Sequence, residues 1–269
     1  MAPSVDVVTE IEEAFVGHWS VFGRWTHGRL VEGDGLVAFE TPITHLPYNG
    51  VIRTRIDGDA DRIVRETLAR YRDRGVNLLW VVQPSSTPDD LGDRLSAHGL
   101  ELVEHATGMS LELADWDGAP PSPDIEYREV LAAADMESYQ ALNAAYWELP
   151  DEDARLAADF QREFGPGRAP GHRYIAVLDG TPIGKGYLSL AAPPGVAGIY
   201  GMSTRPEARG RGVASGMTAA LLDRAKALGC RKVVLHSSEM AVGVYRRMGF
   251  VEHCRFDVFA TAPIWTYPR

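Results

Sequence analysis

The apolar and polar positions divide the chain into strand-like and helix-like segments. In the first part, residues 35–42 and 51–56 alternate like half-buried strands, and residues 77–84 form a short apolar run typical of a buried strand. Residues 60–75 repeat apolar side chains at helical spacing and end at Gly75, which predicts a helix with a glycine stop. Residues 87–113 predict a helix, a glycine, a strand, a turn and a second strand.

The same order returns in fuller form later in the chain. The pattern predicts strands at 125–130, 197–204, 232–238 and 250–261 and helices at 132–147, 151–164, 213–229 and 239–249. Residues 173–191 predict two strands joined at Asp179-Gly180, a dipeptide that suits a type I′ hairpin turn. Both halves end in helix, glycine, strand, turn and strand, so we interpret them as a diverged internal repeat.

The clearest break between the halves follows Gly118, where three prolines fall at positions 120, 121 and 123. Such a segment cannot sit inside regular structure and favours an extended connector. A length of 269 residues suits two ordinary domains. We therefore expect an α/β protein built on a mixed sheet, with domains at 1–118 and 119–269.

Composition narrows the class of protein. A hydrophobic fraction of 45% and a charged fraction of 24% are typical of a soluble globular chain, and no apolar run approaches the ~20 residues of a membrane span. Acidic residues near the N-terminus argue against a signal peptide, so a cytoplasmic location with no membrane partner is expected. Cys230 and Cys254 suffice for neither a disulfide framework nor a zinc site, which predicts free structural thiols and no metal. A net charge of −10 disfavours nucleic acid and favours cationic small molecules.

A loop rich in arginine and glycine stands out against this acidic background. Residues 203–216 join a predicted strand to a predicted helix, whose first turn has free backbone N–H groups and the positive end of its dipole. Gly210 and Gly212 let an anion approach the backbone, and Arg209 and Arg211 add forked donors. This composition favours a pyrophosphate site. A tight turn with solvated arginines is the alternative.

Spacing excludes two common nucleotide motifs. No Gly-Lys-Ser or Gly-Lys-Thr occurs, so a Walker loop is absent from the sequence. Ser215 stands where a dinucleotide-binding loop needs its third glycine, and the next predicted strand ends without the acidic residue that binds a ribose.

The remaining pattern resembles the GNAT N-acetyltransferase superfamily. Arg209, Gly212 and Ala214 match its Q/R-x-x-G-x-G/A signature for acyl-CoA, and Tyr245, Gly249 and Phe250 match its closing Tyr-x-x-x-Gly-Phe pattern. The resemblance covers residues 124–261. The repeated order of elements in the first half also resembles a tandem member of the superfamily whose first half is degenerate. It implies a mixed sheet that splays after its fourth strand, flanked by helices, with acetyl-CoA or another acyl-CoA in the gap.

The resemblance also implies a set of cofactor contacts. The pyrophosphate would lie on backbone amides of the loop and first helical turn, and the pantetheine arm would pair with the backbone of Met202 and Thr204 like an added strand. The residues implied are Met202, Ser203, Thr204, Arg209, Gly210, Arg211, Gly212, Val213, Ala214, Ser215 and Ser238. Ser238 stands where many relatives carry an asparagine, and a role as helix N-cap is its alternative.

Tyr245 is the catalytic residue that the resemblance implies, because a tyrosine there supplies the proton for the departing thiolate. A purely packing role is its alternative. No general base is identified: His236, Glu148 and Asp151 are open candidates, each with a structural or solvated alternative, and water can also take the proton. Tyr146 and Trp147 suit the wall of an acceptor pocket or the core.

The first half lacks a comparable loop, since residues 85–90 place two carboxylates where a pyrophosphate would need positive charge. We expect this half to be structural or to wall the acceptor site with a segment such as residues 44–50. The function implied is an acetyl-CoA-dependent N-acyltransferase for a small-molecule amine, acting as a monomer or homodimer. A non-catalytic acyl-CoA sensor is the alternative.

Overall fold

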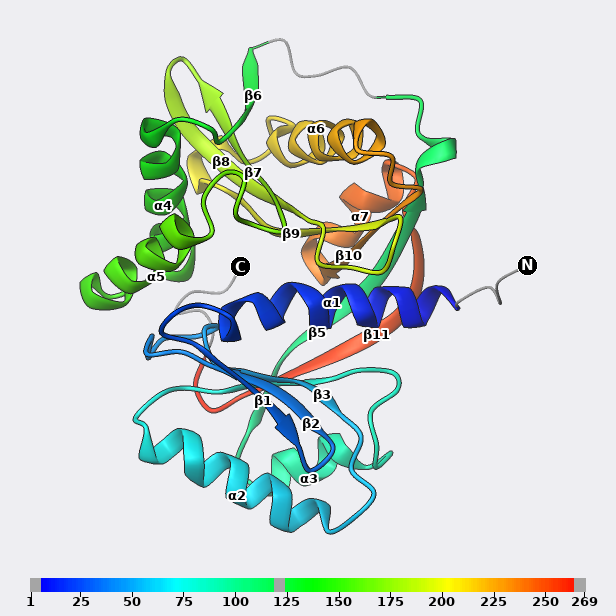
Figure 1. Cartoon of the computed structure of the whole chain (residues 1–269). Coiled ribbons are helices and arrows are strands. Elements are labelled where there is room, and N and C mark those ends of the chain that lie inside the picture. Colours follow the sequence, from blue (N-terminus) through cyan, green and yellow to red (C-terminus); the bar gives the residue numbers. More distant parts are fainter. Residues whose placement is uncertain (1–5, 119–123, 264–269) are drawn as a thin grey trace.

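The computed structural model of the chain describes residues 6–118 and 124–263 (Figure 1). The connector predicted at residues 119–123 lies outside the described residues. The first half contains α1 (Val7–Gly23), β1 (Arg29–Gly33), β2 (Leu36–Glu40), β3 (Gly50–Thr54), α2 (Ala60–Asp73), β4 (Leu79–Val82), α3 (Leu91–Ala97) and β5 (Glu101–Glu112). The second half contains β6 (Ile125–Glu129), α4 (Ala133–Trp147), α5 (Asp151–Glu163), β7 (Gly171–Leu178), β8 (Thr181–Ser189), β9 (Val196–Thr204), α6 (Val213–Ala227), β10 (Lys232–Ser238), α7 (Glu239–Arg247) and β11 (Val251–Ala260).

Local signals placed most of these elements correctly. Asp179 and Gly180 have φ of 49° and 74°, so both central residues of the β7–β8 hairpin are left-handed, as a type I′ turn requires. Gly229, with φ of 78°, follows the end of α6 as a left-handed cap.

All described strands join one eleven-stranded mixed sheet, which confirms the predicted α/β class. The strand order is β1-β2-β3-β4-β11-β5-β10-β9-β8-β7-β6. The last strand of each half is exchanged: β11 pairs with β4 and β5 of the first half, and β5 pairs with β10 of the second. Each half of the sheet therefore contains a strand from the other half.

The sheet splays between β9 and β10. These parallel strands pair from Val196 and Lys232 to Ile199 and Leu235. Beyond that point β9 continues to Thr204 beside β8, and β10 continues to Ser238 beside β5. Because each strand stays bound to its other neighbour, a gap opens between them, as the sequence resemblance implied.

Helix α1 joins the two halves. In Figure 1 it crosses the middle of the molecule, between the helices of the second half and α2 and α3 of the first. Ile11 and Phe15 pack in one apolar cluster with residues of both halves, including Phe39 and Val234. The contact is close at Gly17, where a Cβ atom would lie 2.0 Å from the carbonyl oxygen of Ala191.

An ion pair also fixes α1 to the second half. Lys232 Nζ on β10 donates to the Glu10 carboxylate at 2.7 Å, and Arg231 donates to the other oxygen of Glu10. Burial alone would raise the pKa of Glu10, but the hydrogen bonds from Lys232 and Arg231 outweigh it and lower that pKa.

Three features of the first half differ from the sequence prediction. The pattern gave no helix for residues 7–23 and no strand for residues 29–33, although α1 and β1 occupy them. Residues 101–112 form one 12-residue strand, so the turn predicted within this segment is wrong. Gly108 is needed there for close packing, because a Cβ would lie 2.6 Å from Cys254 Sγ and 3.1 Å from a methyl carbon of Ile11.

Candidate functional site

A cavity of ≈ 930 Å³ opens at the gap between β9 and β10. Its wall is formed by α1, by the loop before β3, by α4 and α5, by the diverging strands, and by the start of α7. Both halves of the chain therefore line it, and aromatic side chains make up much of its surface.

The arginine and glycine loop lies at one end of this cavity. Gly210 and Gly212 have φ of 76° and 78°, a conformation that favours glycine. Gly212 is the N-cap of α6, so the first backbone N–H groups of that helix follow it directly. The Tyr127 ring packs directly against the first turn of α6, because a Cβ on Gly216 would lie 2.1 Å from the Tyr127 hydroxyl oxygen.

The predicted cofactor residues divide into two sets. Those that line the cavity are Met202, Ser203, Thr204, Arg209, Gly210, Ala214 and Ser238. Those in the adjoining loop and first helical turn, outside the lining set, are Arg211, Gly212, Val213 and Ser215. The Val213 side chain is buried in the core, so only its backbone is available to a ligand.

The end of β9 presents a backbone edge to the gap. Thr204 and Ser203 pair with Gly184 and Lys185 of β8 on one side, whereas pairing with β10 on the other side ended at Ile199. An extended chain could therefore add to this edge by main-chain hydrogen bonds.

Tyr245 lies on α7 and reaches the same cavity. The residue is buried, and its ring packs edge-on against Phe250 with centroids 5.7 Å apart. Burial, and to a lesser degree the neighbouring Tyr146, raise the pKa of the Tyr245 phenol. The hydroxyl is therefore protonated at neutral pH.

Ser238 is the N-cap residue of α7, as predicted, but its side chain makes no capping hydrogen bond. It also lines the cavity, so the geometry fits both interpretations of this residue.

His236 lines the cavity among aromatic rings. Its ring centroid lies 4.9 Å from that of Phe15 and 4.3 Å from that of Phe256. Among the described residues neither of its ring nitrogens has a hydrogen-bond partner. Burial lowers the pKa of His236 to about 3, so the imidazole is neutral at physiological pH.

The other candidates from the loop after α4 have separate positions. Tyr146 and Trp147 line the cavity, whereas Glu148 and Asp151 are exposed and are not among its lining residues. Cys230 and Cys254 are free thiols.

Several polar residues of the cavity escaped sequence analysis. His18 on α1 stacks on Tyr200 of β9 with ring centroids 3.9 Å apart, and Arg173 and Lys185 come from β7 and β8. Burial, with smaller contributions from His236, Arg173 and Lys185, lowers the pKa of His18 to about 3. A helical pattern over residues 7–23 was the one signal that could have pointed to His18.

The first half supplies part of the cavity wall through the segment at residues 44–50. Pro47, Tyr48 and Gly50 line the cavity. A residue of the second half fixes Tyr48: the Asn143 side chain donates a hydrogen bond to the Tyr48 hydroxyl oxygen at 2.8 Å. The acidic segment 85–90, in contrast, contributes no residue to the cavity lining.

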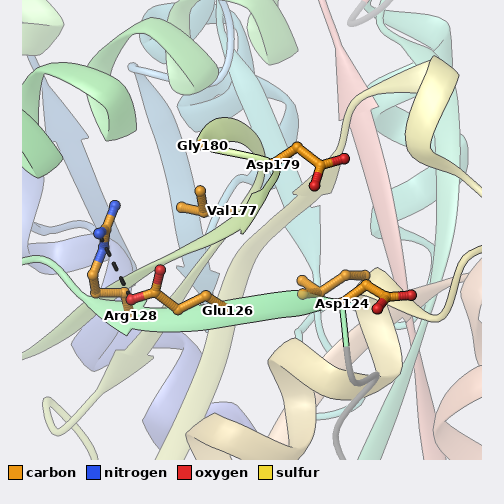
Figure 2. Close-up of a pocket in the computed structure, with 7 residues that line it drawn as sticks. Asp124, Glu126, Arg128, Val177, Asp179 and Gly180 are labelled. Carbon is orange, nitrogen blue, oxygen red and sulfur yellow. Dashed lines mark ion pairs between the residues drawn. The ribbon is translucent and has the colours of Figure 1, made fainter.

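A second hollow, shown in Figure 2, lies on the edge strand β6 and the β7–β8 turn. Asp124, Glu126 and Asp179 line it, and Arg128 forms an ion pair with Glu126 across 3.6 Å. None of the predicted site residues belongs to this hollow.

Among the described helices, none combines the length and apolar character that a membrane crossing requires. In residues 6–118 and 124–263 no group of three or more His, Cys, Asp or Glu side chains could hold a metal ion.

Residues 136–250 match the profile of the Acetyltransferase (GNAT) family. This segment includes the loop at 205–212, the splayed strands and Tyr245. Over these residues the chain is similar to GNAT acetyltransferases, in agreement with the resemblance identified from the sequence.

Curated relatives are similar over part of the chain. Mycothiol acetyltransferase of Streptomyces avermitilis is 30% identical over 162 residues, which are 58% of this chain and 53% of that protein. The enzyme of the same name from Cellulomonas flavigena is 28% identical over 171 residues, 58% of this chain and 49% of its own. The chain thus spans about half the length of the curated relatives it matches.

Solved structures are similar over nearly the whole chain. A GCN5-related N-acetyltransferase from Kribbella flavida aligns with a TM-score of 0.66 and 19% identity, over 92% of this chain and 95% of that one. A tandem GNAT protein from the clavulanic acid biosynthesis pathway aligns with a TM-score of 0.60 and 16% identity, over 99% and 98% of the two chains. These similarities support a tandem GNAT fold for the chain.

Proposed function

We propose that this chain, whose second half is similar to GNAT acetyltransferases, is an acetyl-CoA-dependent N-acetyltransferase that acylates the amine of a small molecule. The observation that carries the proposal is the continuity of one cavity, which runs from Arg209 and Gly210 past the open edge of β9 to Tyr245. The name of the curated relatives, mycothiol acetyltransferase, supports a small-molecule acceptor.

The second half supplies the seat for acetyl-CoA in this proposal. The diphosphate lies at the start of α6, where backbone N–H groups, the helix dipole and the arginines of the loop favour negative charge. The pantetheine arm pairs with the edge of β9 at Met202 and Thr204, which directs the thioester along the gap toward Tyr245.

The proposed reaction is a direct attack on the thioester. The lone pair of the acceptor nitrogen forms a bond to the carbonyl carbon, the carbon–sulfur bond breaks, and the thiolate leaves. Tyr245 gives its hydroxyl proton to the sulfur and recovers a proton from water, while the acceptor nitrogen loses a proton to water. Because burial keeps the pKa of Tyr245 high, the donor is in its protonated form across the physiological range.

The first half, residues 1–118, acts in this proposal as a partner without a cofactor seat. Residues 85–90 offer carboxylates in place of arginines, and this segment lies outside the cavity lining. The half contributes α1 and the loop at 44–50 to the acceptor side of the cavity. Acceptor binding therefore requires both halves.

A thiol-release assay tests the proposal. The full chain is incubated with acetyl-CoA and a panel of amines, polyamines, aminoglycosides and amino acids, and free CoA and acetylated product are measured. Release of CoA in step with an acetylated amine supports the proposed function. Tight binding of acetyl-CoA with no acceptor-dependent release would leave a non-catalytic acyl-CoA protein.

A further inference from the structure

Two basic residues lie deep on one wall of the cavity. Arg173 on β7 and Lys185 on β8 are 8% and 1% exposed, and both line the cavity. They lie near the same aromatic ring: the guanidinium carbon of Arg173 is 5.8 Å and Lys185 Nζ is 5.4 Å from the ring centroid of Tyr139. Positive charge is therefore concentrated in an otherwise aromatic part of the molecule.

The Arg173 guanidinium has more N–H donors than the hydrogen bonds it forms. Within the described part of the chain, the guanidinium has one hydrogen bond, from Nη1 to the carbonyl oxygen of Phe164 at 2.5 Å, and no ion pair with a carboxylate. Its remaining contacts are with the ring faces of Tyr139 and Tyr187. A guanidinium has five N–H groups, and a buried one is costly unless it is paired with an anion.

The carboxylates of the cavity lie on the other side of the gap. Glu104 is on β5 and Glu239 begins α7, and both line the cavity. In the strand order, β5 and β10 lie on one side of the splay, whereas β9, β8 and β7 lie on the other. The cavity is therefore basic on the β7–β8 wall and acidic on the wall that also carries Tyr245.

Much of the remaining lining of this ≈ 930 Å³ cavity is apolar, and it includes Phe15, Trp19, Phe39 and Phe160. A ligand that fills this space needs an apolar body between its charged ends.

We propose that the acceptor is an amphipathic amine with an anionic group, a carboxylate or a phosphate, which Arg173 and Lys185 bind while the amine faces Tyr245. This inference rests on the proposed function and names its substrate class. The pairing of opposite charges orients the acceptor, because an inverted molecule would place its anion against Glu239 and its ammonium against Arg173. Arg173 is a specificity-determining residue in this arrangement.

Binding of matched anionic and neutral probes to the full chain tests the inference without requiring turnover. Three pairs are titrated by calorimetry: 3-phenylpropionate and 3-phenylpropanamide, indole-3-acetate and indole-3-acetamide, and hexanoate and hexanamide. Phenyl phosphate is titrated as well, to test whether the site prefers a phosphate to a carboxylate. For at least one of the three pairs the anion should bind roughly 10- to 100-fold tighter than its amide, or phenyl phosphate should bind to the chain. The preference should persist with saturating CoA, which shows that it does not arise at the cofactor seat.

Variants assign the preference to Arg173. Arg173→Gln should remove it, and Arg173→Lys should restore part of it. Arg65→Gln, at an exposed position of α2 outside the cavity lining, should leave it unchanged. If Arg173→Gln does not fold, the comparison of probes on the parent chain and on Arg173→Lys still decides.

Equal affinity for anion and amide in every pair, together with no binding of phenyl phosphate, would overturn the inference. So would a preference that survives in Arg173→Gln or is abolished by CoA. If the anion binds through Arg173 but no amine is acetylated, the proposed function fails and the anion seat stands.

Discussion

Asp153 of α5 holds Thr44 of the first half by both carboxylate oxygens. The backbone N–H of Thr44 donates to Oδ1 at 3.0 Å, and the Thr44 hydroxyl donates to Oδ2 at 2.8 Å. Asp153 is 3% exposed, so water does not compete for these bonds. The bonds fix the segment at 44–50, part of which lines the cavity.

Asp153→Asn should weaken both stability and acceptor binding. The amide keeps the shape but turns one acceptor into a donor facing a donor, which costs about 1–3 kcal/mol. Urea unfolding should show this loss, and the acceptor KM should rise while acetyl-CoA affinity stays near the parent value. Asp159→Asn, whose carboxylate forms an exposed i,i+3 ion pair with Arg162 on the same helix, is the control. Equal stability of the two variants would contradict the role of Asp153.

Tyr245→Phe should reduce turnover while leaving acetyl-CoA affinity unchanged. The substitution keeps the ring that packs on Phe250 and removes only the proton donor. Turnover should fall by roughly 10²–10⁴-fold, the usual contribution of a general acid. Stopped-flow measurement of CoA release, beside calorimetric binding of acetyl-CoA, separates the two effects. Unchanged turnover would assign Tyr245 to packing alone.

Gly212→Glu should weaken acetyl-CoA binding far more than Gly229→Glu. Both glycines have φ of 78°, one before and one after α6, so the backbone strain is matched. Only at position 212 does the new carboxylate face the proposed diphosphate, where repulsion costs about 1–4 kcal/mol. We expect a loss of about 5- to 1,000-fold in affinity for Gly212→Glu. Equal affinities of the two variants would show that the diphosphate lies elsewhere.

Acid should destabilise the chain through the two cavity histidines. Burial lowers the pKa of His18 and of His236 to about 3, whereas an unfolded histidine titrates near ~6.5. Between these values the unfolded chain binds protons that the folded chain does not, so the free energy of unfolding falls as pH falls from ~6.5 toward 3. Each histidine contributes a slope of up to about 1.4 kcal/mol per pH unit.

His236→Asn should reduce the slope of the unfolding free energy against pH by the contribution of one histidine, up to about 1.4 kcal/mol per pH unit. Urea unfolding at pH 7, 6 and 5 measures it, with His27→Asn at an exposed position as the control. An identical slope in the parent and in His236→Asn would show that His236 has the same pKa in the folded and unfolded chains.

Much of the fold could be predicted because its signals are local. Glycine stops at Gly75, Gly229 and Gly249 and the hairpin at Asp179-Gly180 are set by neighbouring residues, and all four are present. The exchange of β5 and β11 has no local signal, because the same alternating pattern suits either partner. The turn predicted near Gly108 was wrong because that glycine is required by packing against Cys254, a residue far away in the sequence.

The two sides of the candidate site differ in the same way. The cofactor side is one contiguous loop with a recognisable spacing, so Arg209, Gly210 and Gly212 could be proposed from sequence. The proposed acceptor side collects His18, Arg173 and Lys185 from separate elements, and no pattern links them before the chain folds. Net charge could not predict this arrangement, because it sums the whole chain and does not show that Arg173 and Lys185 lie on one wall of the cavity.

The number of acetyl-CoA molecules that the full chain binds tests the central claim most directly. A calorimetric titration should give one site per chain, because glycine-permitted amides and arginines converge at a helix start only in the described part of the second half. Two equivalent sites would show that the first half also holds the cofactor, and the absence of binding would contradict the proposed function itself.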